Sequence, residues 1–301
     1  MANIINAGTS FPPEIAEEVF NLVKGESALA KLSDQKPIHF SGDTFWTFNL
    51  DSEAAIVGES AQKTNGGATV GQITIKPLKF EYGFRVSNEF VIANDEQRAD
   101  ILRGVPEAMA KKMARALDIA ALHGVNPRTG TPSPLIGANH FDRAAESDGS
   151  ATITGTANPD ADIQGAISAI AAQNNEVTGA AISPIYASQL AALKDSTGRQ
   201  MFPELGYGVN VSSIKGLPVA VNSTVPVAGS GGDRAVVGDF RNRFRWGVAA
   251  EIPFKVIEYG NPDNDNEAGD LQGSNQVYLR SEVFFGWGIL DFSSFVRIIN
   301  A

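Results

Sequence analysis

The spacing of hydrophobic residues predicts extended structure early in the chain. Residues 45–50 alternate between apolar and polar side chains and are rich in aromatic and β-branched types, which is typical of a strand. The turn-rich segment 62–67 follows, and the alternation returns over 73–90. We therefore expect a long two-stranded ribbon over 44–90. Since a lone ribbon is marginally stable in water, another surface must cover it, and a neighbouring subunit is the simplest candidate.

The longest helical pattern spans 95–124. Its apolar stripe recurs at helical spacing and comprises Leu102, Val105, Met109, Met113, Ala116, Leu117 and Ala120. Gly124 stands where a left-handed C-cap is expected, and Pro106 should either kink the helix or begin its main segment. A short helix that begins at Pro13 and ends before Gly25 is also expected, with another turn over 27–32.

The middle of the chain alternates between helices and short strands. Asn158-Pro159 and Ser183-Pro184 each combine a capping side chain with a proline, which predicts two helix starts. Strands are expected over 177–182, 217–221 and 235–240, with a glycine-rich loop over 229–232 before the last of them. This order indicates a compact α/β unit over about 155–245.

The tail returns to extended structure. Residues 246–259 and 276–299 form long apolar-alternating runs that are separated by a polar, turn-rich segment. The elements before and after the α/β unit therefore look like one layer that the unit interrupts. The fold class predicted is α+β with an inserted α/β unit.

Composition narrows the class of protein. Of the 301 residues, 43% are hydrophobic, and 24 basic against 34 acidic residues give a formal net charge of −10. The acidic balance argues against tight nucleic-acid binding. The absence of cysteine excludes disulfides and thiolate metal sites. No apolar run of about 18 residues and no secretory signal occur, so we expect a protein made and used in the cytosol, without a membrane partner.

No conventional enzyme site is evident. Neither a phosphate-binding glycine loop nor a GxSxG motif occurs. The three histidines are scattered, and His123, at the end of the long helical pattern, suits a structural role beside the helix dipole. Trp46, Trp246 and Trp287 lie in strand patterns and are expected to be packing residues. We therefore expect no catalytic residues, no cofactor and no bound metal.

One acidic segment partly mimics a calcium-binding loop. Asp263, Asp265 and Glu267 stand at alternate positions, as ligands of such a loop do. However, the required glycine is replaced by Ala268, and the closing glutamate by Ser274. The pattern favours a solvated acidic turn.

Four stretches carry a family resemblance. They are KKMARALDIAALHGVNPRTG over 111–130, SPIYASQLAALKDSTGRQMF over 183–202, GLPV over 216–219 and VGDF over 237–240. In this order they resemble the major capsid proteins of tailed bacteriophages, which have the Hong Kong 97-type capsid fold that encapsulins share. The resemblance covers essentially the whole chain.

The resemblance implies a division of the chain into parts. Residues 1–36 would be an N-terminal arm with its short helix, and 50–82 an extended loop called the E-loop. The peripheral domain would comprise 37–49, 83–155 and 246–301, including a spine helix over about 95–124, and the axial domain would be 156–245.

The function that the resemblance implies is self-assembly. Subunits would form pentamers and hexamers of an icosahedral virion capsid, assembled in the bacterial host cytoplasm, that encloses double-stranded DNA without sequence-specific binding. The arm is too short for a fused scaffolding extension, so a separate scaffolding protein is expected, together with a portal and decoration proteins. A net charge of −10 suits a container that must release its DNA.

The resemblance also suggests one covalent reaction. In the family's type member, a lysine of the E-loop attacks an asparagine of a neighbouring subunit while a glutamate acts as base. Lys63, Asn275 and Glu282 stand at the corresponding positions. The alternative is that Lys63 is an interface charge, Asn275 a turn residue and Glu282 a solvated strand residue.

Two rival functions remain open on the sequence alone. An encapsulin nanocompartment would have the same fold and would enclose an enzyme in place of DNA. A soluble enzyme of unknown type would need a pocket of converging titratable groups, for which the sequence has no pattern.

Overall fold

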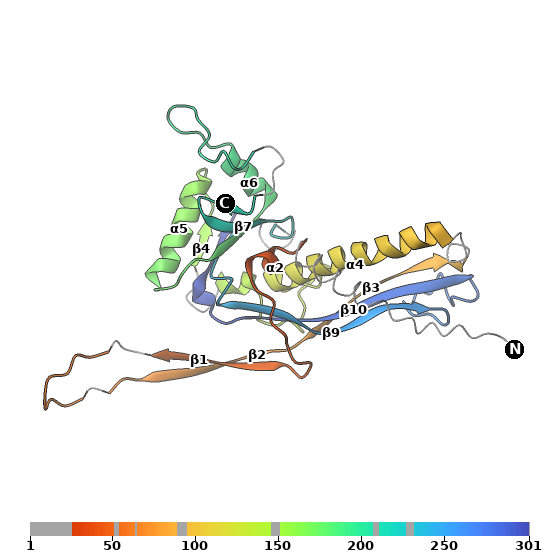
Figure 1. Cartoon of the computed structure of the whole chain (residues 1–301), viewed down its shortest axis with the longest axis horizontal. Coiled ribbons are helices and arrows are strands. Elements are labelled where there is room, and N and C mark those ends of the chain that lie inside the picture. Colours follow the sequence, from red (N-terminus) through yellow and green to blue (C-terminus); the bar gives the residue numbers. More distant parts are fainter. Residues whose placement is uncertain are drawn as a thin grey trace.

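A computed structural model describes residues 26–50, 54–63, 65–88, 95–145, 151–206, 211–226 and 232–300. Its elements form a two-stranded hairpin, a three-stranded sheet beside a long helix, and a six-stranded sheet with two helices (Figure 1). The short helix expected over 13–24 and most of the expected loop over 229–232 lie outside the described residues. None of the described helices is long and apolar enough to cross a membrane.

The hairpin projects from the rest of the molecule (Figure 1). Strand β1 (Asp43–Leu50) pairs antiparallel with β2 (Ala68–Ile75) along its whole length. The ribbon does not continue to residue 90, because the next strand, β3 (Leu78–Ser87), belongs to another sheet. The division falls at Lys76-Pro77, where proline has no N–H for a strand ladder. The paired hairpin thus covers 43–75 and not the expected 44–90.

The three-stranded sheet has the order β3-β10-β9, with β10 (Gln276–Ile289) between β3 and β9 (Phe244–Ile257). Helix α4 (Asp95–His123) lies along it (Figure 1). Val283, Phe285 and Trp287, at alternate positions of β10, are buried in one cluster with Met113, Leu117 and Ala120 of α4. The expected long helix is confirmed, and it runs through Pro106 without interruption. Gly124 ends it with φ of +66°.

On the face of this sheet opposite α4, residues 36–38 and the base of the hairpin pack against glycines. A Cβ atom on Gly247 would lie 1.8 Å from the carbonyl oxygen of Lys36, and one on Gly288 would lie 2.6 Å from the Ile75 side chain. A Cβ on Gly286 would lie 3.0 Å from Ile38. These glycines therefore allow residues 36–38 and the base of the hairpin to rest directly on the sheet.

The six-stranded sheet has the order β4-β11-β8-β5-β7-β6. Its strands are β4 (Ala151–Thr154), β5 (Gly179–Ile182), β6 (Ser213–Ile214), β7 (Leu217–Val221), β8 (Asp233–Gly238) and β11 (Phe295–Ile299). Helices α5 (Pro159–Ala172) and α6 (Pro184–Ala191) pack on this sheet. Each has the expected N-cap: the Asn158 side chain accepts a hydrogen bond from the Ala161 N–H, and the Ser183 side chain accepts one from the Tyr186 N–H. Both predicted helix starts are confirmed.

The end of the chain lies in the six-stranded sheet. The predicted extended run over 276–299 is interrupted after β10 by a 3-10 turn, η2 (Phe292–Ser294), whose N–H groups Asp291 caps. The turn redirects the chain, so that β11 pairs with β4 and β8. Residues 295–299 therefore do not continue the layer of β9 and β10, as the sequence pattern had indicated.

Two apolar cores hold these parts together. One, between α4 and the three-stranded sheet, extends through Phe141, Phe240 and Phe295 into the six-stranded sheet. The other fills the space beneath α5 and α6. Trp246 and Trp287 are buried as expected. Trp46 is 60% exposed on the hairpin, so its expected packing role is wrong within a single chain.

Candidate functional site

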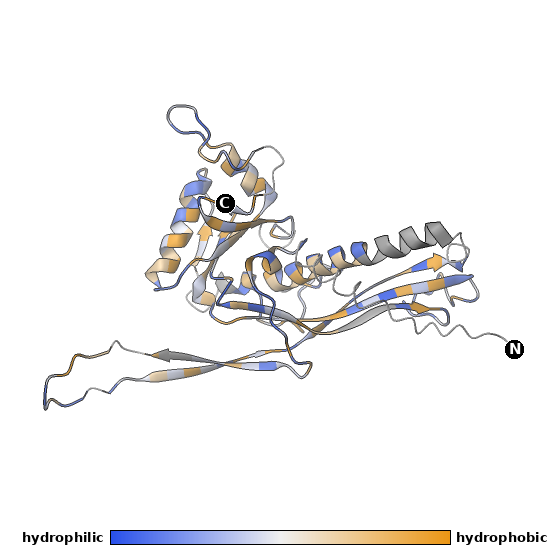
Figure 2. Ribbon diagram, viewed as in Figure 1, coloured by the Kyte–Doolittle hydropathy of each residue, from blue (hydrophilic) through white to orange (hydrophobic). Residues whose placement is uncertain are grey.

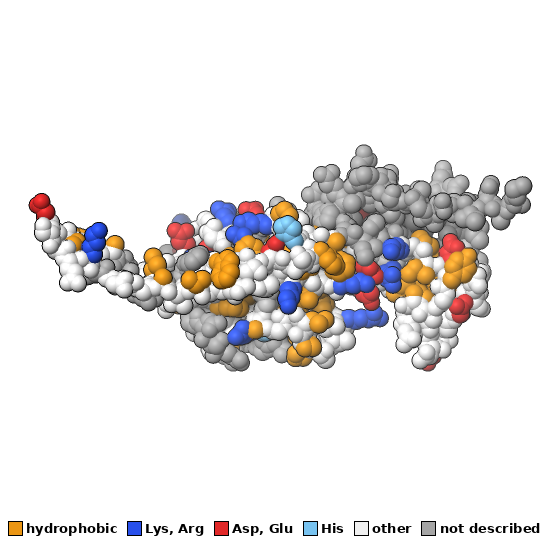
Figure 3. Space-filling model, turned by 90° about the horizontal axis from the view of Figure 1, so that it is seen from below, with side chains coloured by type: hydrophobic (Ala, Val, Ile, Leu, Met, Phe, Trp, Pro, Cys, Tyr) orange, Lys and Arg blue, Asp and Glu red, His pale blue; other side chains and the backbone are white. Residues whose placement is uncertain are grey.

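An apolar face of the hairpin is exposed. Leu50 pairs across the ribbon with Ala68, and Val70 lies two residues further along the same face, which Trp46 shares. Leu50 is 73% exposed, Val70 52% and Trp46 60%. Figure 2 shows apolar positions along both hairpin strands, and Figure 3 shows apolar side chains on the exposed ribbon. Contiguous exposed apolar surface of this kind marks an interaction site.

The tip of the hairpin is exposed too. Ile56 is fully solvent-accessible, and Val57 is 42% exposed. Among the described strands, none pairs with either outer edge of the ribbon. Ordered two-stranded ribbons need a covering partner, and the described part of this chain does not cover the face with Trp46, Leu50 and Val70.

The residues proposed for cross-linking lie in different parts of the molecule. Lys63 is exposed in the loop that joins β1 to β2. Figure 1 shows this loop at the opposite end of the molecule from the start of β10. Asn275 is a turn residue with φ of +51°, immediately before β10, and its side-chain oxygen accepts a 3.0 Å hydrogen bond from Asn88. Within one chain, Lys63 does not approach Asn275 or Glu282, so a link would have to join two copies.

Glu282 is not a solvated residue. Its side chain lies on the strand face opposite the α4 core and is 4% exposed. Its Oε1 atom lies 2.8 Å from Nζ of Lys79 and 3.0 Å from Nε of Arg280. The sequence pattern missed this burial because strand alternation identifies the face of a residue and not what covers that face.

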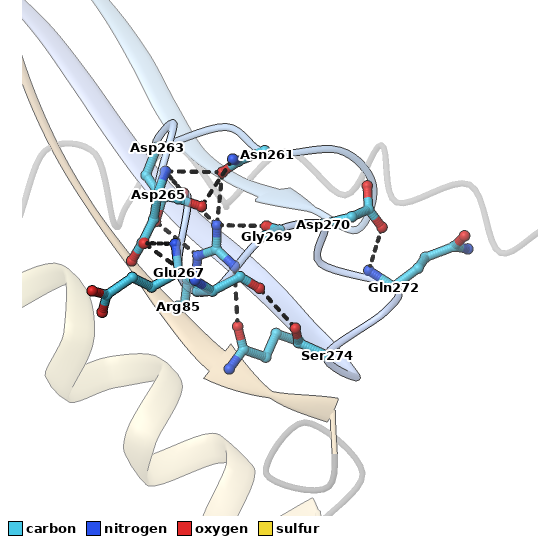
Figure 4. A network of polar contacts seen from close by, with 11 residues as sticks. Arg85, Asn261, Asp263, Asp265, Glu267, Gly269, Asp270, Gln272 and Ser274 are labelled. Atoms are coloured by element: carbon cyan, nitrogen blue, oxygen red, sulfur yellow. Dashed lines mark hydrogen bonds and ion pairs between the residues drawn. The ribbon is translucent and has the colours of Figure 1, made fainter.

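Arg85 organises the acidic turn that resembles a calcium loop (Figure 4). Its Nε and Nη2 donate to both carboxylate oxygens of Asp263, at 2.8 and 2.5 Å. Nη2 also donates to the side chain of Asn261 and to the carbonyl of Gly269, at 2.8 and 3.0 Å. The hydrogen bonds from Arg85 hold the pKa of Asp263 at about 2. A guanidinium from β3 thus supplies the positive charge at the centre of this turn.

A buried carboxylate anchors the first described helix to α4. Asp118 of α4 accepts hydrogen bonds from the Ser27 hydroxyl at 2.5 Å and from the Ala28 N–H at 2.8 Å. These groups open helix α2 (Ala28–Leu32). Asp118 also accepts from the Thr224 hydroxyl at 3.0 Å. Burial raises the pKa of Asp118, while these donors favour its charged form.

A second buried cluster joins the end of α4 to the six-stranded sheet. His123 Nδ1 lies 3.0 Å from Asp142 Oδ2 and 3.7 Å from Asp233 Oδ2. Arg297 Nη2 contacts the other oxygens, Oδ1 of Asp142 at 3.1 Å and Oδ1 of Asp233 at 2.7 Å. His123 lies at the end of α4 as expected, and its structural role stays a prediction. Its partners were not predicted because they lie on three separate segments of the chain.

Comparison with known proteins identifies a family and several solved structures that this chain resembles. The model of the phage capsid family matches residues 7–299. A structure from Mycobacterium phage Ogopogo is 31% identical and has a TM-score of 0.78, with 92% of each chain covered. A structure from Gordonia phage Cozz is 29% identical and has a TM-score of 0.72, with 91% of this chain and 86% of that chain covered.

A more distant structure has the same fold. It is the capsid of a native GTA particle, which is 14% identical, has a TM-score of 0.61, and aligns over 91% of this chain and 90% of its own. None of the curated proteins compared with the chain matches it significantly. Because the family model covers nearly the whole chain, the protein belongs to the phage capsid family. It is a structural, shell-forming protein of the class of tailed-phage major capsid proteins.

Proposed function

We propose that copies of this chain assemble as pentamers and hexamers into an icosahedral shell that encloses double-stranded DNA. The observation that carries the proposal is the exposed apolar face of the β1–β2 hairpin, which includes Trp46, Leu50 and Val70. A surface of this kind is expected to be covered by a neighbouring copy. In a closed shell each subunit makes several such contacts at once, so individually modest interfaces become strong together.

The parts of the fold have distinct roles in this proposal. In this proposal the E-loop is the hairpin over 43–75 and not the expected 50–82, because β3 begins at Leu78 and lies in another sheet. Helix α4 is the spine helix, and the sheet of β3, β9 and β10 is the body of the peripheral domain. The six-stranded sheet with α5 and α6 is the axial domain at the capsomer centres. Its sheet takes β4 and β11 from the flanking segments, which supports axial-domain boundaries wider than 156–245.

The proposal includes partners outside the shell lattice. We infer a separate scaffolding protein, a portal and decoration proteins, and assembly in the cytoplasm of the bacterial host. The enclosed DNA is bound without sequence preference, in keeping with the net charge of −10. The encapsulin alternative differs in content and particle size and not in the fold.

Two substitutions on neighbouring hairpin residues test the role of the apolar face. Val70→Lys places a charge on the face with Trp46 and Leu50, whereas Thr69→Lys places it on the opposite face. Both residues are exposed in the chain, so neither change should unfold the subunit.

We expect Val70→Lys to abolish shells in electron micrographs, because the buried interface would have to accept an unpaired ammonium group. Thr69→Lys should assemble as the unmodified protein does. Equal assembly of the two variants, with normal circular dichroism spectra, would exclude the apolar face as an essential contact.

A further inference from the structure

The cluster around His123 contains two carboxylates between two potential cations. The Oδ2 atoms of Asp142 and Asp233 face the imidazole, at 3.0 and 3.7 Å from Nδ1. Their Oδ1 atoms face one guanidinium nitrogen of Arg297, at 3.1 and 2.7 Å. Asp233 is 2% exposed, and its Oδ2 atom has no hydrogen-bond partner besides this contact with the imidazole. The groups come from α4, from the 3-10 turn η1 (Phe141–Ala145), from β8 and from β11.

Hydrogen-bond chemistry determines where the imidazole carries hydrogen. His123 Nε2 lies 3.0 Å from the carbonyl oxygen of Thr224. A carbonyl only accepts hydrogen bonds, so Nε2 must be the donor and carries a hydrogen. The opposite nitrogen, Nδ1, lies against the carboxylate of Asp142. A bare nitrogen lone pair facing a carboxylate is repulsive, so one additional proton must lie between them.

Charge counting supports the same conclusion. With that proton, two carboxylates are balanced by an imidazolium and a guanidinium. Without it, two buried carboxylates face Arg297 alone, and the cluster keeps an unpaired negative charge, which is costly at a buried site. Thus the folded chain holds a proton that the unfolded chain releases above the ordinary histidine pKa of about 6.5.

We propose that His123, Asp142, Asp233 and Arg297 form a proton-dependent lock that fastens the end of α4 and η1 to the six-stranded sheet. Loss of the shared proton leaves the carboxylates of η1 and β8 repelling each other across the junction. The lock therefore makes the connection between the two sheets of the subunit sensitive to pH in the neutral range. This goes beyond shell assembly, and it does not require assembly for its test.

The pKa shifts of His123 and Asp233 agree with this geometry. Burial alone lowers the pKa of His123, but the hydrogen bond to Asp142 and its charge outweigh burial and raise the pKa above its usual value. Burial, followed by the charge of Asp142, raises the pKa of Asp233 to about 7. Both directions describe a folded cluster that retains one proton more than the unfolded chain does.

Besides the four residues of the cluster, the side chains of His140 and Arg143 face it from the segment around η1. Burial, with the charges of Arg143 and Arg297, lowers the pKa of His140. A lowered pKa means that the folded chain binds fewer protons at His140, so its effect is a loss of stability as pH falls below about 6.5. The lock acts in the opposite direction, because its raised pKa values make the folded chain bind more protons and lose stability as pH rises. The slope above about pH 6.5, where His140 is neutral in both states, therefore reports the lock alone.

The test is the unfolding equilibrium of the unassembled full-length chain in urea, measured from pH 5.5 to 9. Above pH 6.5 we expect the folded-to-unfolded ratio to fall by up to tenfold per pH unit, because unfolding releases one proton. Asp142→Asn should remove this slope, because its amide NH₂, at the position 3.0 Å from Nδ1, supplies without ionisation the hydrogen that the shared proton supplied. His140→Gln is the matched control and should keep the slope.

Several results would overturn the proposal. A flat profile above pH 6.5 in the unmodified chain is one, and an unchanged slope in Asp142→Asn is another. A ring nitrogen of His123 and one carboxylate oxygen each from Asp142 and Asp233 lie within 4.8 Å of one another, a spacing that a divalent cation would also require. Stoichiometric Zn²⁺ or Mn²⁺ in the purified chain, with a slope that EDTA alters, would replace the proton by a metal ion.

Discussion

Lys63 is the residue through which a covalent link between subunits is predicted. Its exposure at the hairpin tip allows it to reach a second copy, but a lysine is a nucleophile only when it is neutral. We expect boiled, denatured mature particles to show ladders of covalent oligomers on a gel, and Lys63→Ala to remove them. Lys76→Ala, at the base of the hairpin, is the control that should keep the ladder. A single band at the monomer mass from unmodified particles would refute the cross-link.

Individual residues differ in how far the sequence predicts their role. Ser183 and Asn158 are predicted correctly because a cap acts on N–H groups two or three residues away. The surroundings of His123 depend on Asp142, Asp233 and Arg297, which are brought together only by the packing of three separate segments. Similarly, a strand pattern cannot distinguish the exposed Trp46 from the buried Trp246.

At the scale of elements, the crossing of the chain over the three-stranded sheet depends on Gly247. A methyl group there would meet the Lys36 carbonyl oxygen at 1.8 Å, and backbone atoms cannot move aside as a flexible side chain can. We expect Gly247→Ala to destabilise the subunit by about 1–3 kcal/mol, the usual cost of overpacking, in urea unfolding. Gly58→Ala, which meets nothing within 4 Å, should cost much less. Similar losses for both would contradict this role of Gly247.

Elements with a strong local period are predicted well, and their pairing is not. The long helix follows from its apolar stripe, and the structure places it over Asp95–His123. Strands β2 and β3 belong to different sheets because β3 pairs with β10, which lies about 200 residues later in the chain. This pairing involves Gln276 to Phe285 of β10. Alternation identifies both strands but contains no information about their partners.

At the scale of the whole molecule, two sheets with a shared core carry a projecting hairpin (Figure 1). The described chain leaves its face with Trp46, Leu50 and Val70 uncovered. The order of elements along the sequence predicts this layout, including the inserted α/β unit. It does not predict that β11, at the end of the chain, completes the inserted sheet. Because β4 and β11 belong to the flanking segments, the inserted unit cannot be separated from the rest as a continuous piece of chain.

The central claim is that this subunit builds closed shells. The measurement that tests it most directly is negative-stain electron microscopy of the full-length chain after sizing chromatography, made alone and together with a candidate scaffolding protein. We predict closed particles of megadalton mass in the void fraction, whose diameter separates a capsid from a nanocompartment. A small, discrete oligomer that stays unchanged in the presence of the scaffolding protein would contradict the account.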